Sequence, residues 1–532
     1  MEMALADNQE NSGWAPRHNP WLIAVVVAMA AFMEVLDTSI ANVALPHMAG
    51  NLGASQDQST WVLTSYLVSN AIVLPITGWL TSIIGRKRFF LICITIFTVS
   101  SLLCGIAPSL GFLLLARVIQ GAGGGGLQPM AQAILADIFP PEKRGLAFSL
   151  YGVTAVCAPA IGPTLGGWLT DNYSWRWIFL INLPVGLLTM VLVHYLVDDP
   201  PFLKRKTLRE SKLDYVGLSA LAIGIAALQI VLDKGQEDDW FSSHFITVLT
   251  IIAVVCLTFM VLWEWYEKDP IVDVRLFKSF NFSAANVMMF LVGAVSFSST
   301  VLMPQFLQSL MGYTAQKAGM VLSGAALILL IELPIVGILT SKIQGRYLMA
   351  AGWGMLSVAM YISTKQIDLL MSFQSASILR VIQYIPIGFV FIPATTVAYI
   401  GIPQEKSNSV AGLVNFMRNL GSGFGTSAVT TILAQRSQFH QVRLTEHTAT
   451  GDVNFQSMLN GSAQAAQSTA GNGHADASQV GLAHIYQTVQ TQASSLSYLD
   501  VFHVLMVTTG IMFFLSFLLR ANKPKKQAMA AH

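Results

Sequence analysis

The stretch "LLLARVIQGAGGG" (residues 113–125) places an arginine in the middle of a long apolar run. Its central letters, RVIQ, occur again at 380–383, an offset of 263 residues. Each copy is followed by another apolar run and then by a polar turn. The two turns are "FPPEKRG" (139–145) and "IPQEKSN" (402–408), and their shared Pro, Glu and Lys keep the same offset. Matches in the same order indicate that the chain contains two related halves.

A further pair of similar stretches lies upstream of these copies. "GWLTS" (78–82) is matched by "GILTS" (337–341) at the similar offset of 259 residues. The repeat therefore aligns the second, fourth and fifth apolar runs of the chain with the tenth, twelfth and thirteenth. Parallel halves of this kind are typical of secondary transporters, which bind their substrate between the halves near the middle of the bilayer.

The composition places the chain in a membrane. Of its 532 residues, 54% are hydrophobic and only 11% charged, and the mean hydropathy is +0.58. Soluble domains carry about 25% charged residues. We therefore predict a polytopic membrane protein and expect no nucleic-acid partner. The four cysteines lie in apolar runs without paired spacing, so we expect neither a disulfide framework nor a metal site.

Fourteen apolar runs are long enough to cross a membrane as helices, which takes roughly 20 residues each. They lie near 21–45, 60–83, 89–107, 110–136, 145–170, 177–197, 215–232, 245–265, 282–303, 317–341, 347–364, 379–400, 409–433 and 499–519. With a cytoplasmic N-terminus, 21 of the 30 Lys and Arg residues fall in cytoplasmic segments, 6 on the other face and 3 inside spans. Because Lys and Arg are enriched in cytoplasmic loops, this asymmetry predicts that both termini are cytoplasmic.

The repeat and the span count predict an all-α protein with two six-helix bundles and two extra helices, 14 transmembrane helices in all. The N-terminal bundle covers residues 1–200 with spans 1–6, and the C-terminal bundle covers 281–532 with spans 9–14. Residues 201–280 form a linker that carries spans 7 and 8. The segment 435–498 is too polar to cross the membrane and is expected to be a non-cytoplasmic loop, in which 483–497 has the pattern of an amphipathic helix.

Five motifs stand out along the chain: "LDTSIANVALP" (36–46), "GWLTSIIGRKR" (78–88), "LLLARVIQGAGGG" (113–125), "APAIGPTLGG" (158–167) and "PIVDVRLFK" (270–278). Together they resemble the major facilitator superfamily. The second and third resemble its helix 2–3 loop and its helix 4 arginine motif, and the fourth resembles its antiporter signature in helix 5. The first and last resemble the fourteen-helix drug:proton antiporter branch. The resemblance covers nearly the whole chain and is greatest to EmrB-type multidrug exporters.

This resemblance implies a proton-coupled antiporter that exports hydrophobic drugs or toxic compounds across a bacterial inner membrane. Its energy source would be the proton gradient, with no cofactor. The segment 435–498 would contact a periplasmic adaptor (membrane fusion protein), which continues the path to an outer-membrane channel; the alternative is a flexible solvated loop. The second candidate function is a proton-coupled importer or uniporter of a small metabolite on the same fold. An enzyme is not expected, because the ten histidines are scattered without a catalytic cluster.

Two acids lie in the middle of the first span. Glu34 and Asp37 are three residues apart, so they share one side of a helix. A charge at the membrane centre costs roughly 2.5–3.5 kcal/mol, so such a group must face a water-filled cavity, pair with a cation or be protonated. A carboxyl group that takes up and releases protons is what a proton-coupled carrier requires. We expect Asp37 and Glu34 to be proton-coupling or substrate-binding groups; the alternative is a static salt bridge or hydrogen bond between helices.

The resemblance implies that Arg117, inside span 4, is the cationic partner of Asp37. Protonation or a cationic drug would then break the pair; the alternative is a static buried salt bridge. Glu332, in span 10, is a second protonatable site or cation contact, or else a local hydrogen bond at the Pro334 kink. The second copy of the arginine, Arg380, is expected to be structural, because span 9 has no matching acid.

The remaining candidates are polar or small residues of the spans. Asn42, Asn415 and Arg418 are possible cavity-lining residues, with packing as the alternative. The motif residues with structural roles are Gly78, Gly85, Arg86, Gln120, Gly121, Pro159, Gly162, Pro163, Gly166 and Gly167. The run "GAGGGG" (121–126) is not a phosphate loop, because it lacks the following Lys-Ser/Thr, and it favours close helix packing instead. The helix 5 motif is expected to seal a seam against the other half. Ser82 stands where the loop motif usually has an acid.

Overall fold

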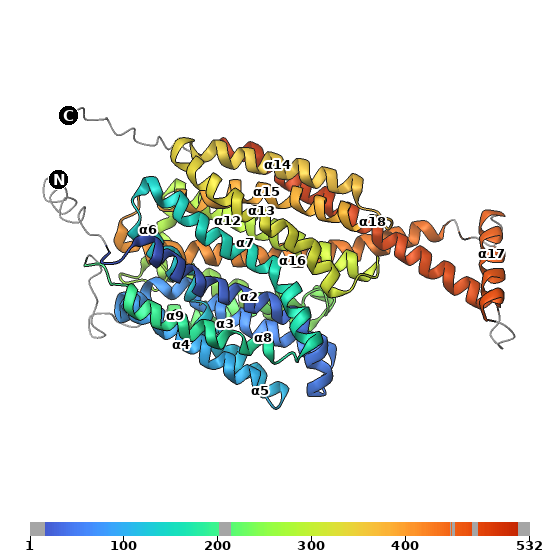
Figure 1. Ribbon diagram of the computed structural model, residues 1–532, viewed down its shortest axis with the longest axis horizontal. Coiled ribbons are helices and arrows are strands. Elements are labelled where there is room, and N and C mark those ends of the chain that lie inside the picture. Colours follow the sequence, from blue (N-terminus) through green and yellow to red (C-terminus); the bar gives the residue numbers. More distant parts are fainter. Residues whose placement is uncertain (1–15, 202–213, 447, 449–452, 471–476, 520–532) are drawn as a thin grey trace.

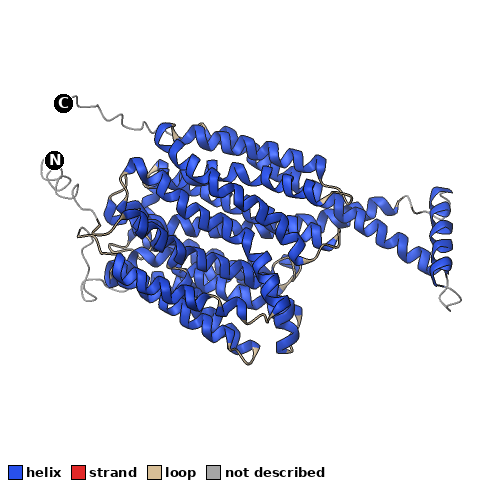
Figure 2. Ribbon diagram, in the orientation of Figure 1, coloured by secondary structure: helices blue, strands red, loops and turns tan. Residues whose placement is uncertain are grey.

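The computed structural model describes residues 16–201, 214–446, 448, 453–470 and 477–519. Every regular element within these residues is a helix (Figure 2). The expectation of an all-α protein is therefore confirmed for the described part of the chain.

The first half of the chain, which we call the N-half, consists of the helices up to α9. They are α2 (Pro20–Leu52), α3 (Gln56–Ile84), α4 (Arg86–Gly105), α5 (Leu110–Gly124), α6 (Leu127–Ile138), α7 (Pro141–Asn172), α8 (Trp177–Leu180) and α9 (Asn182–Leu196). Two spans that we expected to be continuous are each divided in two, one at Gly125 and Gly126 and the other at Ile181. The first break lies where the chain passes close to α3: a Cβ on Gly125 would lie 2.7 Å from the Asn70 carbonyl oxygen.

The rest of the chain consists of an extra pair of helices followed by the C-half. The extra pair is α10 (Tyr215–Lys234) and α11 (His244–Tyr266), with the short helices η2 (Trp240–Ser242) and η3 (Val274–Lys278). The C-half consists of α12 (Phe280–Ser309), α13 (Ala315–Lys342), α14 (Gly345–Gln366), α15 (Phe373–Ala398), η4 (Gln404–Lys406), α16 (Ser407–Thr445), α17 (Val453–Ala470) and α18 (Ala477–Ser516).

Twelve helical segments of the described residues are long and apolar enough to cross a membrane, with α5 and α6 counted together and α8 and α9 likewise. Two further expected spans, 347–364 and 409–433, fall in α14 and α16, which are not among the twelve. Both helices nevertheless pack inside the bundle, α14 between α15 and α18, and α16 between α12 and α18. The total of fourteen spans stays a prediction.

The two halves meet along two main seams, α7 with α13 and α3 with α16, and α16 and α15 also contact α6 and α7, respectively. Glycines allow the close approach. A Cβ on Gly337 of α13 would lie 2.7 Å from the Gly145 carbonyl oxygen of α7. In the other seam, a Cβ on Gly412 of α16 would lie 2.6 Å from the Leu74 carbonyl oxygen of α3. Helix α10 packs on both α3 and α16 and so covers this second seam.

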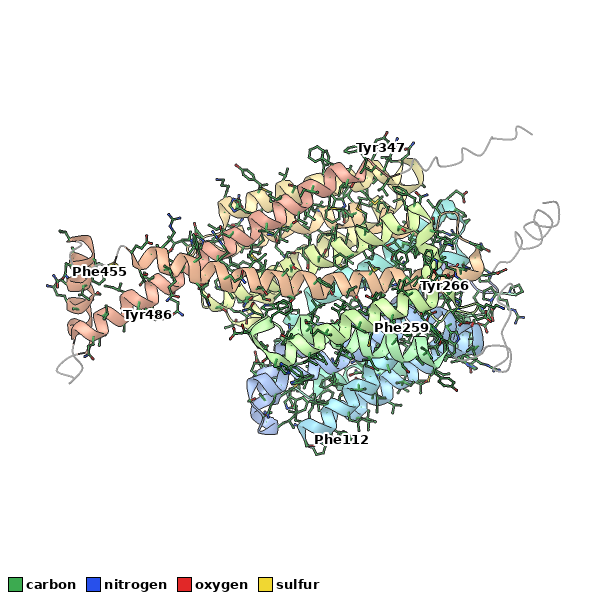
Figure 3. The ribbon with its side chains drawn as sticks, turned by 180° about the vertical axis from the view of Figure 1, so that it is seen from behind. Phe112, Phe259, Tyr266, Tyr347, Phe455 and Tyr486 are labelled. Carbon is green, nitrogen blue, oxygen red and sulfur yellow. The ribbon has the colours of Figure 1, made fainter. Side chains whose placement is uncertain are left out.

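Helices α16 and α18 are 39 and 40 residues long, about twice what a membrane span requires. Their adjoining ends project from one end of the bundle as an arm, with α17 across its tip (Figure 1). Phe455 and Tyr486 stand on this arm, well away from the bundle (Figure 3). The segment 435–498 is thus largely helical in its described residues, and the helix expected at 483–497 lies within α18; its place on the non-cytoplasmic side stays a prediction. At the base of the arm, Asp500 accepts from Arg436 at 2.5 Å.

Candidate functional site

Helix α2 carries both acids of the first span near its centre. Glu34 and Asp37 are buried, with 3% and 2% of their surfaces exposed. Three residues along an α-helix turn through about 300°, so the two side chains lie almost one turn apart and point about 60° from each other. This difference in direction places them in two separate hydrogen-bond networks.

Asp37 accepts hydrogen bonds from three side chains of its own half. Arg117 Nη1 lies 2.6 Å from Asp37 Oδ2 and forms a fully buried ion pair with it. Gln120 Nε2 and Asn182 Nδ2 lie 3.1 Å and 2.7 Å from Asp37 Oδ1. Both amides also donate to the Ser101 hydroxyl, at 3.2 Å and 3.0 Å. A paired and fully hydrogen-bonded carboxylate is the form in which a charge is tolerated at this depth.

The Arg117 guanidinium is fixed by further contacts. Its Nε donates to the Val62 carbonyl at 3.1 Å, and its Nη1 donates also to Gln120 Oε1 at 2.7 Å. Its Cζ lies 4.2 Å from the centre of the Tyr66 ring, within the range of a cation–π contact. Because these groups hold the arginine in place, any loss of charge on Asp37 leaves a cation buried without its counter-ion.

Glu34 accepts hydrogen bonds from neutral side chains only. The Tyr66 hydroxyl and Asn70 Nδ2, both on α3, lie 3.0 Å and 3.1 Å from its Oε1. Gln128 Nε2, on α6, donates to its Oε2. Within the described residues Glu34 makes no ion pair, so hydroxyl and amide dipoles stabilise it in place of a cation.

Gln128 connects Glu34 to the C-half. Its Oε1 accepts from Arg418 of α16. The same Oε1 atom lies 3.1 Å from the Tyr151 hydroxyl of α7. The single O–H of Tyr151 donates to Asn415 Oδ1 of α16, at the shorter distance of 2.6 Å. The structure thus brings two of the three possible cavity-lining residues, Asn415 and Arg418, into one buried network with Glu34, at the junction of the halves. The third, Asn42, is exposed on α2 and lies outside this network.

The second RVIQ motif repeats the geometry of the first without an acid. Arg380 Nη1 donates to the Ser299 carbonyl at 3.0 Å and to Gln383 Oε1 at 2.9 Å, and its Nη2 donates to Thr300 Oγ1 at 2.8 Å. Its Cζ lies 4.1 Å from the centre of the Tyr384 ring. All these partners are uncharged and belong to the C-half, as expected for a structural arginine.

Glu332 lies on α13, apart from both networks. Neither of its carboxylate oxygens has a hydrogen-bond partner among the described residues. A Cβ on Gly388 of α15 would lie 2.5 Å and 2.6 Å from these oxygens, so the glycine provides the space that the acid occupies. The local hydrogen bond that we considered at the Pro334 kink is therefore not present in the described structure.

The residues of the helix 2–3 motif lie at one end of the α3–α16 seam. Gly78 faces Ser409 of α16, and a Cβ on it would lie 3.0 Å from the Ser409 Cβ. Gly85 has a φ of 90°, a conformation that favours glycine, and it ends α3. Arg86 begins α4 and pairs with Asp137 at 2.5 Å. Asp137 also accepts from Ser407, the first residue of α16, at 2.8 Å, so this acid links the two halves.

The prolines of the helix 5 motif explain one contact between α2 and α7. Pro163 has no N–H to donate to the carbonyl four residues earlier, which is that of Pro159. The Ser39 hydroxyl of α2 donates to this Pro159 carbonyl at 3.0 Å. A side chain of the helix 1 signature therefore satisfies a backbone group that the helix 5 signature leaves free.

The glycines of the helix 5 motif face two different neighbours. A Cβ on Gly162 would lie 2.5 Å from the Ser39 Cβ, and one on Gly166 would lie 3.0 Å from Ile40 Cγ2. These two glycines, four residues apart on one helix face, pack on α2 of their own half, so the expected seam against the other half is wrong for them. Gly167 points toward α13, where a Cβ on it would lie 3.8 Å from the Gln316 nitrogen.

Gly121 of the helix 4 motif allows α5 to approach α3: a Cβ on it would lie 3.0 Å from the Ser69 Cβ. Within the described ranges, no three His, Cys, Asp or Glu side chains lie close enough together to hold a metal ion.

Sequence reasoning missed the neutral members of both networks, which are Tyr66, Asn70, Ser101, Gln128, Gln132, Tyr151 and Asn182. Each of them is an uncharged polar side chain inside an apolar run, which is the feature of the sequence that could have identified it.

Comparison with known proteins gives matches over most of the chain. Residues 27–426 match the family profile described as Major Facilitator Superfamily. The chain is similar to the Multidrug export protein EmrB of Haemophilus influenzae, with 41% identity over 426 residues, 80% of this chain and 83% of that protein. Its identity with the Multidrug export protein EmrB of Escherichia coli strain K12 is 40% over 438 residues, 82% of this chain and 85% of that protein.

A solved structure shares the fold. The proton:xylose symporter XylE, bound to 6-bromo-6-deoxy-D-glucose, aligns with a TM-score of 0.59 and 14% sequence identity, over 95% of this chain and 97% of that chain. At this level of identity the likeness concerns the arrangement of helices alone.

Proposed function

The chain belongs to the Major Facilitator Superfamily of transporters, and from this premise we propose that it is a proton-coupled antiporter that exports hydrophobic drugs or toxic compounds. The match to this family confirms the resemblance that the five sequence motifs indicated. The apolar helices make it a multi-pass membrane protein, and its family is one of non-enzymatic transporters. The similarity to multidrug export proteins over four-fifths of the chain supports export of small hydrophobic molecules.

The observation that carries the proton-coupling proposal is the buried pair of Asp37 and Arg117 in the centre of the N-half. A proton that binds Asp37 removes its charge and weakens the pair, and a cationic substrate competes with Arg117 for the same carboxylate. Proton and drug would then bind in alternation, which is the requirement of antiport. The cross-half network of Glu34, Gln128 and Arg418 supports alternating access, because it must break when the halves separate.

The proposal extends to the surroundings of the protein. We place it in a bacterial inner membrane with both termini cytoplasmic, on the distribution of Lys and Arg. The arm formed by α16, α17 and α18 would then project into the periplasm. Its length supports contact with a periplasmic adaptor and, through it, with an outer-membrane channel.

The test is an export assay with a control of the energy source. Cells that overproduce the protein should accumulate less of a fluorescent hydrophobic drug, and a protonophore should restore the accumulation. The purified protein in proteoliposomes should move protons when drug is added. Accumulation that rises with overproduction would instead support the importer or uniporter on the same fold.

A further inference from the structure

Arg380 of the second RVIQ motif is a fully buried cation that has no acidic partner among the described residues. It is 0% exposed, and its guanidinium donates only to neutral oxygens of Ser299, Thr300 and Gln383. Its Nε has no hydrogen-bond partner in the described structure. Buried arginines are almost always paired with an anion, because an uncompensated charge in a protein interior is costly.

The helices around Arg380 offer no acid that could pair with it. Helices α12, α14, α15 and α16 contain neither Asp nor Glu. Helix α13 carries Glu332, whose oxygens lie against Gly388, eight residues and therefore about 12 Å along α15 from Arg380. The other acids on the helices that pack on α15, and in the turn before it, are exposed: Glu142, Asp171 and Asp368.

The N-half shows what faces this arginine when its charge is compensated. The offset of 263 residues relates Arg117 to Arg380 and Asp37 to Thr300. In the N-half, the Asp37 carboxylate lies 2.6 Å from Arg117 Nη1. In the C-half, the Thr300 hydroxyl oxygen lies 2.8 Å from Arg380 Nη2. The same place beside the guanidinium is therefore negative in one half and neutral in the other.

Two donors converge on this neutral oxygen. The Thr300 hydroxyl donates its single proton to the Ser296 carbonyl at 2.7 Å. The Tyr384 hydroxyl, 2.8 Å from Thr300 Oγ1, is therefore the donor in that contact, beside the donor Arg380 Nη2. Hydrogen bonds to an ionised acceptor are roughly twice as strong as those to a neutral one. Two donors directed at one place, one of them cationic, thus favour an anion there.

We propose that the C-half binds a chloride ion beside Arg380, held by the guanidinium and the Tyr384 hydroxyl at the place that the Asp37 carboxylate takes in the N-half. The Thr300 side chain yields this place by changing its χ1 rotamer, of which threonine has two in a helix. Chloride supplies the same single negative charge as Asp37 and takes up no proton at accessible pH. The site is a structural counter-ion site, and it is independent of the proposed export function.

The test compares the melting temperature of the purified full-length protein, in an uncharged detergent, in sodium chloride and in sodium gluconate of equal ionic strength. Chloride should raise the melting temperature of the wild type saturably, by roughly 2–5 °C, because a ligand that binds only the folded protein stabilises it. Thr300→Asp supplies a fixed carboxylate at the site and should melt at the same temperature in both salts. Arg380→Gln should also lose the response. Tyr384→Phe should raise the chloride concentration for half of the effect roughly 10-fold.

Two control variants should keep the response to chloride. Thr300→Asn matches Thr300→Asp in size without its charge, and Arg443→Gln removes an exposed positive charge from α16. If Arg380→Gln does not fold, Thr300→Asp still tests the proposal, because it retains the arginine. Equal melting temperatures of the wild type in the two salts overturn the proposal. A wild-type response to chloride in Thr300→Asp or in Arg380→Gln overturns it as well, because the anion then binds elsewhere.

Discussion

Asp37 and Thr300 hold equivalent positions in the two halves of the protein, each against the arginine of an RVIQ motif. Asp37 Oδ2 lies 2.6 Å from Arg117, and Thr300 Oγ1 lies 2.8 Å from Arg380. The offset of 263 residues that relates the two arginines also relates the acid to the threonine. The arginine is thus present in both halves and the carboxylate in one, which supports the proposal that proton coupling resides in the N-half.

Asp37→Asn is expected to abolish drug–proton exchange, because an amide takes up no proton at accessible pH. The change also leaves Arg117 as a buried cation without its counter-ion, which costs about 3–5 kcal/mol of stability. The measurement is drug-dependent proton movement in proteoliposomes, with folded protein selected by gel filtration. Thr300→Val is the control at the equivalent place in the C-half and should exchange normally. Wild-type exchange by the Asn variant would show that Asp37 is not the coupling acid.

Glu34→Gln is expected to reduce export of cationic drugs and to spare uncharged ones. The side chain keeps its size, but the negative charge at the junction of the halves is lost. A hydrogen bond to a charged group is worth about 1.5–3 kcal/mol, so kcat/KM for a cation should fall roughly 10- to 100-fold. The measurement compares one cationic and one uncharged drug in the same vesicles. If proton exchange stops with both drugs, Glu34 is a coupling group and not a recognition group.

Glu332→Gln is expected to stabilise the protein and to lower its export activity. Both carboxylate oxygens are buried without a hydrogen-bond partner in the described structure, and an unpaired buried acid is more costly than an amide. The gain should be about 1–3 kcal/mol, seen as a higher apparent melting temperature of the purified protein. Glu142→Gln, on the exposed first turn of α7, is the control and should leave the melting temperature unchanged. A lower melting temperature in Glu332→Gln would mean that the acid has a structural partner.

A disulfide between α3 and α16 is expected to stop transport. With a side chain at position 78, its Cβ would lie 3.0 Å from the Ser409 Cβ, close to the 3.5–4.5 Å of a disulfide. The double variant Gly78→Cys with Ser409→Cys should therefore cross-link under mild oxidation and hold this end of the seam closed. Export should return on reduction, and each single variant should be insensitive to oxidant. Undiminished export by the cross-linked protein would show that the halves do not separate here.

The sequence predicted the duplication and the helices of the two halves, because apolar runs and repeated motifs carry that information directly. It did not predict the breaks at Gly125 and Ile181, since both runs remain apolar across them. Within the polar segment 435–498 it predicted a helix only at 483–497, whereas α16, α17 and α18 make most of the described residues helical. The Gln, Ser and Ala residues there are compatible with a helix, but only the packing of α16 and α17 on α18 determines that one forms.

For the site, the sequence identified the charged residues and not their neutral partners. The resemblance implied that Arg117 would lie beside Asp37. The link from Gln128 to Arg418 joins residues 290 positions apart, and an uncharged amide in an apolar run gives no indication of its partner. Glu332 was recognised as an intramembrane acid, but its lack of hydrogen bonds depends on Gly388, which only the three-dimensional structure brings next to it.

Removal of the tip of the arm is expected to abolish drug resistance in cells and to leave transport in vesicles intact. Residues 447–476, which include α17, would be replaced by a flexible Gly-Ser segment of the same length. The base of the arm, where Asp500 bonds to Arg436 and to His440 at 2.5 Å and 2.7 Å, stays intact. Because both networks of the bundle are untouched, drug–proton exchange in proteoliposomes should continue near the wild-type rate.

In cells with two membranes, the same variant should lose drug resistance if the arm holds an adaptor that carries drug past the outer membrane. Drug released into the periplasm would otherwise re-enter the cell. The comparison of vesicles and cells therefore distinguishes loss of a partner from loss of the pump. Resistance equal to that of the wild type would show that the tip is not the adaptor contact. Loss of exchange in vesicles as well would show that the arm is needed for the bundle itself.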